Sequence, residues 1–214
     1  MMAYINDYPH MKGIQIYLHD QLVYDEYRKD VVHDAKHKTG CIFKSFISAA
    51  IGIALKNEII DSVDQTFASI LPNLSVSDPR MRHITIRHAL CKTTGIAWPP
   101  PDQDIDISNI QSIFRLNMDD DPGMTFAYKP DPQLLVYLLS EISGMHFDGY
   151  VEEHLFKPLG ICDYAWDGSM SNIQEMEMTM KDIAKLGMLY LNEGKWNGAD
   201  LSMPDYLTIL NTYG

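Results

Sequence analysis

Basic residues are scarce in this 214-residue sequence, which has 17 Lys and Arg against 29 Asp and Glu and a formal net charge of -12. Since no cluster of basic side chains could displace counterions from a phosphate backbone, nucleic acid is excluded as a partner. Long apolar runs are also lacking. The longest uncharged apolar stretch, Ser45 to Leu55, is far shorter than the roughly 18 residues that span a bilayer, so we expect no membrane span.

Cysteine is scarce as well. Cys41, Cys91 and Cys162 are odd in number and widely spaced, and they form no C-x-x-C pair, which predicts free thiols in a reducing compartment. The first ten residues, MMAYINDYPH, lack the basic region followed by an apolar one that is typical of a secretory signal. Both features favour a cytoplasmic protein.

Motifs for cofactors and metals are missing. There is no G-x-G-x-x-G or Walker-type loop, so no nucleotide site is predicted. His33 and His37 are four residues apart and His88 lies near Cys91, but neither pair has further ligands at a recognisable zinc spacing. The aspartates between positions 102 and 121 match no cation-binding loop and are interpreted as a solvated face. We therefore expect no cofactor and no metal.

What is present is an apolar content of 46%, enough for a buried core and typical of one domain over residues 1–214. Two β-type runs around His19-Asp20-Gln21 predict a hairpin. No second strand-rich region follows, and the rest is mainly helical. The expected helices cover Ile42–Lys56, Thr85–Leu90, Phe147–Leu155 and Met180–Leu191. A further helix is expected to begin with Asp131 as its cap and Pro132 as its first residue, and to stop at Gly144.

The segment Ile42–Lys56 is apolar nearly all round, which predicts a buried helix. Its polar residues Lys44, Ser45 and Ser48 share one stripe with Cys41. A thiol in the first turn lies near exposed amides and the positive helix end, which favours thiolate, and Lys44 could pair with it or act as a base. The alternative is that Cys41 is a small buried hydrophobe and Lys44 extends to solvent.

Several segments together carry a resemblance to a known family. They are CIFKSFISAAIGIALKNEIIDSVDQTFASILP, ITIRHALCKTTGIAW, PGMTFAY, QLLVYLLSEISGMHFDGYVEEHLFKPLGI and MTMKDIAKLGMLYLNEGKWNG. In this order they resemble the penicillin-recognising serine hydrolases, also called β-lactamase-related proteins, whose first motif is S-x-x-K at the start of a buried helix. The resemblance implies an α+β fold, with N-terminal strands in residues 13–40 and a mainly helical region in 41–214 packed on an antiparallel sheet.

The resemblance also implies an activity, acyl transfer from a small-molecule ester, amide or β-lactam to water. Cys41 would attack the carbonyl, Lys44 would take its proton, and Tyr128 would relay a proton to the leaving group. The Cys41 amide would supply half of the oxyanion hole. Substrate identity and oligomeric state stay open.

The sequence departs from the family pattern in three places. Cys41 replaces the serine, and Tyr128-Lys129-Pro130 stands where Y-x-N is expected, so Pro130 offers no side-chain amide. We interpret Lys38-Thr39-Gly40 and Lys92-Thr93-Thr94-Gly95 as coincidental likenesses to the third motif, K-T-G or H-T-G. The chain ends at Gly214, before that motif and the last strands are expected, which predicts a C-terminally incomplete domain with only the hairpin strands present. An inactive relative or gene fragment that acts by binding is therefore the competing hypothesis.

Overall fold

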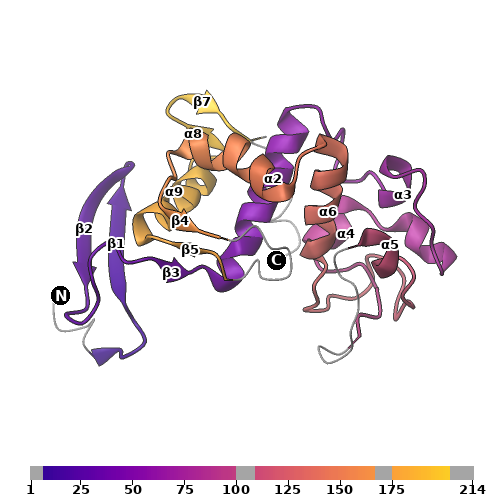
Figure 1. Ribbon diagram of the computed structural model, residues 1–214, viewed down its shortest axis with the longest axis horizontal. Helices are drawn as coiled ribbons and strands as arrows, with labels where there is room; N and C mark the ends of the chain where they lie inside the picture. The colour runs from indigo at the N-terminus through magenta and orange to yellow at the C-terminus, as the bar shows by residue number, and fades with distance from the viewer. Residues whose placement is uncertain (1–6, 100–108, 167–174, 203–214) are drawn as a thin grey trace.

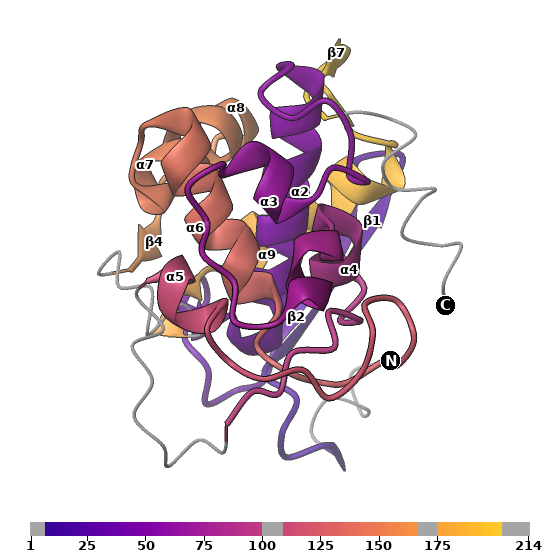
Figure 2. The same cartoon turned by 90° about the vertical axis from the view of Figure 1, so that its right-hand side faces the viewer.

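Helix α2 (Phe43–Lys56) runs through the middle of the computed structural model, which describes residues 7–99, 109–166 and 175–202. Figure 1 shows a β-hairpin at one end of the molecule and helices α3 (Phe67–Ile70), α4 (Ile86–Leu90) and α5 (Ile110–Ile113) at the other. Seen from that second end, α2 is still central (Figure 2). The fold has the predicted mixed α and β class.

The hairpin has the predicted position, with β1 (Gly13–Leu18) antiparallel to β2 (Gln21–Tyr27). Its two-residue turn places His19 and Asp20 at positive φ, 49° and 62°, the geometry of the tight turns that suit twisted strands. The hairpin adjoins helix α9 (Met180–Leu191) through Asn192, whose side-chain amide donates to the Asp20 carboxylate at 2.9 Å.

The predicted helices are present. After α4 and its Thr85 cap, the chain forms α6 (Pro132–Ser143), which ends at Gly144 with φ 65°. The segment predicted from Phe147 continues as α7 (Phe147–Val151), a π-helical turn (Glu152–Phe156) and α8 (Lys157–Leu159). The described residues also form two 3-10 turns, η1 (Gly40–Ile42) and η2 (Pro79–His83), and α9 has the predicted bounds.

One predicted cap is wrong. Asp131 does precede α6, but its side chain does not cap the helix, because its backbone is already helical at φ -47° and ψ -37° instead of extended as capping requires. The buried carboxylate instead accepts a hydrogen bond from Trp98 Nε1 at 2.6 Å.

The structure adds short strands that the sequence did not predict. Strands β3 (His37–Lys38), β5 (Glu177–Met178) and β4 (Tyr164–Ala165) form a small antiparallel sheet in that order, and β6 (Lys195–Trp196) pairs with β7 (Ala199–Asp200). Two-residue strands are too short to show an alternating pattern. The first of these sheets matters for the site because β3 leads directly into η1.

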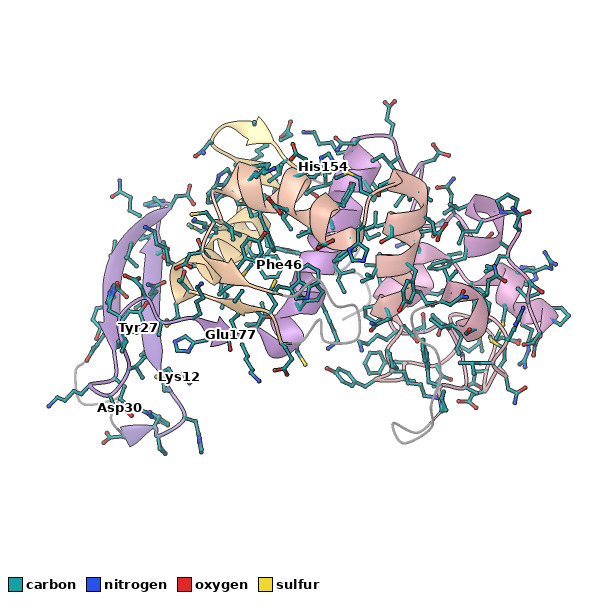
Figure 3. All side chains as sticks on the ribbon, in the orientation of Figure 1. Lys12, Tyr27, Asp30, Phe46, His154 and Glu177 are labelled. Atoms are coloured by element: carbon teal, nitrogen blue, oxygen red, sulfur yellow. The ribbon has the colours of Figure 1, made fainter. Side chains whose placement is uncertain are left out.

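The core surrounds α2, and Phe46, which is labelled in Figure 3, packs there against other aromatic rings. Phe43 and Phe46 are fully buried. The Phe46 ring meets Phe156 edge-on at 5.5 Å, and Phe43 meets Trp166 at 5.4 Å. These contacts tie α2 to the π-helical turn and to the segment after β4. Within the described residues, no helix is long and apolar enough to cross a membrane.

Replacing Phe46 with alanine should lower the free energy of unfolding by about 3–5 kcal/mol, because the ring is fully buried and its removal leaves a cavity. Urea denaturation measures this. The matched control is Phe126→Ala: that ring is 66% exposed, so a change of about 0.5 kcal/mol or less is expected. Equal losses in both variants would contradict the central place of Phe46.

Candidate active site

The three residues singled out in the sequence meet at one point on the surface. Cys41 lies in η1, Lys44 in the first turn of α2, and Tyr128 in the loop before α6. The Cys41 Sγ atom lies 3.1 Å from the Tyr128 hydroxyl, and the Lys44 Nζ atom lies 3.4 Å from that sulfur and 3.3 Å from that hydroxyl. The three groups thus form a triangle of hydrogen-bonding contacts.

The position of Cys41 is set by the short sheet and the turn that follows it. The Thr39 amide donates to the Met176 carbonyl at 2.8 Å, and the Thr39 carbonyl accepts from the Ile42 amide at 3.0 Å. Thr39 is buried, whereas Cys41 is exposed. The alternative of a buried, inert Cys41 is therefore not what the structure shows.

A cavity of about 230 Å³ opens beside Lys44, where the polar stripe of α2 faces outward. Its lining includes Ser45 and Ser48, as the helical spacing predicted, together with Tyr190 from α9. The Tyr190 hydroxyl donates to the Ser45 carbonyl at 2.8 Å. Leu90, Pro132 and Leu135 supply apolar walls, so the cavity suits a small and partly apolar group.

Lys92 is a site residue that the sequence analysis missed. Its Nζ atom lies 3.8 Å from the centroid of the Tyr128 ring and donates to the Lys129 carbonyl at 2.9 Å. The sequence predicts only a coincidental motif around Lys92, whereas the structure places its side chain against Tyr128. One feature of the sequence could have indicated a site residue here: Lys92 directly follows two apolar residues, Leu90 and Cys91, at the end of a short predicted helix.

The surroundings favour the ionised form of Cys41. Hydrogen bonds from the Tyr128 hydroxyl and from Lys44, with the charges of Lys44 and Lys92, lower the pKa of the Cys41 thiol. By contrast, burial raises the pKa of the Cys91 thiol. Cys41 therefore has the environment of a reactive thiolate.

The polar neighbours of Pro130 do not replace the amide that is missing from the second motif. Lys129 extends away from the cluster and pairs with Asp119 at 2.8 Å. Asp131 is held by Trp98 and by the Thr94 amide at 3.5 Å, and burial raises the pKa of its carboxyl group. Neither side chain contacts Cys41 or Lys44 in the hydrogen bonds of the described residues.

The histidines considered as metal ligands have other contacts. His33 contacts Asp25 and Asp34, and His88 completes a capping box with Thr85. Across residues 7–99, 109–166 and 175–202, no three His, Cys, Asp or Glu side chains gather as a metal site would require.

This geometry, with a thiol at the start of a buried helix and a lysine one turn later, occurs here in a β-lactamase-like fold. The family model for beta-lactamase matches residues 5–186, and the chain belongs to that family. No curated protein sequence matches the chain.

Solved structures share the fold at low sequence identity. A beta-lactamase-like protein from Bacteroides dorei superposes with a TM-score of 0.78 at 19% identity, over 92% of this chain and 62% of its own. EstCE1, described as a hydrolase with promiscuous acyltransferase activity, gives 0.74 at 14% identity, over 91% and 70%. An octameric penicillin-binding protein homologue from Pyrococcus abyssi gives 0.68 at 15% identity, over 92% and 55%. The chain thus spans between about half and about two thirds of these structures.

The lowered pKa of Cys41 predicts that iodoacetamide modifies this thiol at unusually low pH. In a Cys91→Ala/Cys162→Ala variant, where Cys41 is the single cysteine, the half-maximal rate should fall below the pH of about 8.5 that is typical of a free cysteine. Lys44→Met should move this midpoint to higher pH, since a hydrogen bond and a charge that favour thiolate are lost. An unchanged midpoint would contradict the described contacts.

The raised pKa of Asp131 predicts a pH-dependent stability. The folded protein binds this proton more tightly than the unfolded chain, so the contribution is fully present below about pH 4 and is lost as pH rises through the folded pKa. In Asp131→Asn, stability should therefore fall less between acidic and neutral pH, as urea denaturation at each pH would measure. Asp120→Asn, in an exposed position, controls for the loss of one negative charge. Parallel curves for the parent and Asp131→Asn would be evidence against a buried ionisable carboxyl.

Proposed function

We propose that the protein is an acyl-transfer hydrolase that cleaves an ester or amide bond, including that of a β-lactam, through a thioester on Cys41. The observation that carries the proposal is the triangle of Cys41, Lys44 and Tyr128, with every pair of functional atoms within 3.4 Å. Such contacts meet the requirement that a nucleophile and its proton-transfer groups lie within reach of one another.

In the first half-reaction, the Cys41 thiolate attacks the substrate carbonyl and the oxygen becomes an oxyanion. The Cys41 amide is one donor to that oxygen. When the tetrahedral intermediate collapses, the bond to the leaving group breaks. Tyr128 gives its proton to the leaving group and takes one from the Lys44 ammonium.

The second half-reaction returns the site to its starting state. Water attacks the thioester while neutral Lys44, acting through Tyr128, accepts the proton of that water. The carbon–sulfur bond then breaks and the thiolate leaves. Lys44 is again an ammonium beside a thiolate, so protons and electrons balance over the cycle.

The substrate belongs to the small molecules that fit beside Lys44. A cavity of about 230 Å³ with apolar walls accommodates a short acyl chain or a small leaving group. The described cysteines are all free, which suits a reducing compartment, so a cytoplasmic location is part of the proposal.

Incubation with 4-nitrophenyl acetate or a penicillin should leave one acyl group on Cys41, visible as a mass increase of the intact protein and assigned by peptide mapping. Because a thioester forms, neutral hydroxylamine should remove the group. Cys41→Ala should carry no such adduct, whereas Cys162→Ala, which lacks a different exposed thiol, should be acylated normally.

Absence of the adduct from the parent protein would contradict the covalent mechanism. It would favour the competing hypothesis of an inactive relative that acts by binding. An adduct that persists in Cys41→Ala would show that Cys41 is not the nucleophile.

A further inference from the structure

We propose that Lys92 is the positioning residue of Tyr128: its ammonium holds the phenol ring beside Cys41 and Lys44 and stabilises negative charge on the phenol oxygen. The catalytic part of this inference rests on the proposed function. Its structural part, the contact of Lys92 with the Tyr128 ring, does not depend on the proposed function.

Lys92 contacts the chain on both sides of Tyr128. Its main-chain carbonyl accepts a hydrogen bond from the Ala127 amide at 3.0 Å, and its Nζ atom donates to the Lys129 carbonyl at 2.9 Å. Between these two contacts, Nζ lies 3.8 Å from the centroid of the Tyr128 ring, well within the range of a cation–π interaction. Lys92 therefore contacts Tyr128 and both of its neighbours in the chain.

Tyr128 needs a contact that fixes its ring, because few packed neighbours restrict its side chain. Its side chain is 67% exposed and comes from a loop, yet its hydroxyl has to stay within 3.3 Å of both Cys41 and Lys44. An exposed ring that is free to rotate would leave this position for much of the time. The Lys92 ammonium lies over the ring face and so restricts that rotation.

The backbone of Lys92 determines which substitution best tests its side chain. Helix α4 ends at Leu90 with Cys91 as its C-cap, and Lys92 follows with φ 57°, a left-handed conformation for which glycine is the usual residue. Glutamates take the same conformation after the caps of α2 and α9, Glu58 with φ 58° and Glu193 with φ 54°, whereas Gly144 and Gly160 end α6 and α8. A lysine in this conformation is strained, so glycine at position 92 fits the backbone better.

The electrostatic surroundings are consistent with the second role of Lys92. Burial and then the charge of Lys44 lower the pKa of Lys92, while Asp131 and Cys41 act in the opposite direction and favour its ammonium form. The Lys92 charge in turn helps to lower the pKa of Cys41. When Tyr128 passes its proton to a leaving group, the phenol oxygen gains negative charge. A cation over the ring face stabilises that charge together with Lys44.

Three substitutions separate the side chain from the backbone. Lys92→Gly removes the ammonium and relieves the left-handed strain, so the thermal midpoint should stay the same or rise while activity falls. Lys92→Met removes the charge and keeps the length. Lys92→Arg keeps a cation that can stack on the ring and should restore most of the activity.

The expected loss in kcat for Lys92→Gly and Lys92→Met is about 3- to 30-fold, the range of a cation–π contact, with a smaller change in KM. The loss should be larger for an alkyl ester than for a 4-nitrophenyl ester, because only the poorer leaving group depends on the proton from Tyr128. In a Tyr128→Phe background, Lys92→Met should add less than about a twofold loss, since coupled residues are not additive. Equal losses for both esters, or in both backgrounds, would overturn the positioning role.

A readout without turnover separates this inference from the proposed function. In the single-cysteine variant, Lys92→Met and Lys92→Gly should move the pH midpoint of Cys41 alkylation upward, and the shift should be smaller when Tyr128 is phenylalanine. A parent protein that neither hydrolyses esters nor forms an adduct would refute the proposed function while this shift still tests Lys92. Midpoints that match the parent's would overturn the inference whether or not the protein is an enzyme.

Discussion

Burial of α2 is the constraint on which the rest of the structure depends. Phe43 and Phe46 point into the aromatic core and fix the rotation of the helix about its axis. Because side chains follow a period of 3.6 residues, the same rotation turns Lys44 and Ser45 outward and leaves Cys41 exposed ahead of them. The packing that stabilises the fold therefore also aims the groups proposed to carry the chemistry.

The second feature of the structure is a positively charged site in a protein whose net charge is negative. The net charge is -12, yet Lys44 and Lys92 both line the cavity, and none of the described residues in its lining is acidic. Two ammonium groups beside a thiol stabilise a thiolate, and a phenol between them can pass protons. These surroundings suit the sulfur nucleophile that we propose.

The sequence predicted some elements well and others poorly, for identifiable reasons. The bounds of α9 and the Gly144 stop of α6 were correct, since helix periodicity and end signals are local. Asp131 looked like a cap, but Trp98, 33 residues away, takes its carboxylate. The contact between Lys92 and Tyr128 was not predicted because the two residues are distant in sequence and because three-letter motifs occur by chance.

By itself, the sequence determined the hairpin, the buried helix and the stripe that holds Cys41 and Lys44 on one face, because these follow from the spacing of side chains over short segments. The α+β fold class came from the resemblance to a family. The resemblance to a family pointed to Tyr128 from its motif. Only the tertiary structure decided that Tyr128, 87 residues from Cys41, lies 3.1 Å from its sulfur, and that Lys92 covers its ring. Such contacts join residues far apart in the chain, so they depend on how the whole core packs around α2.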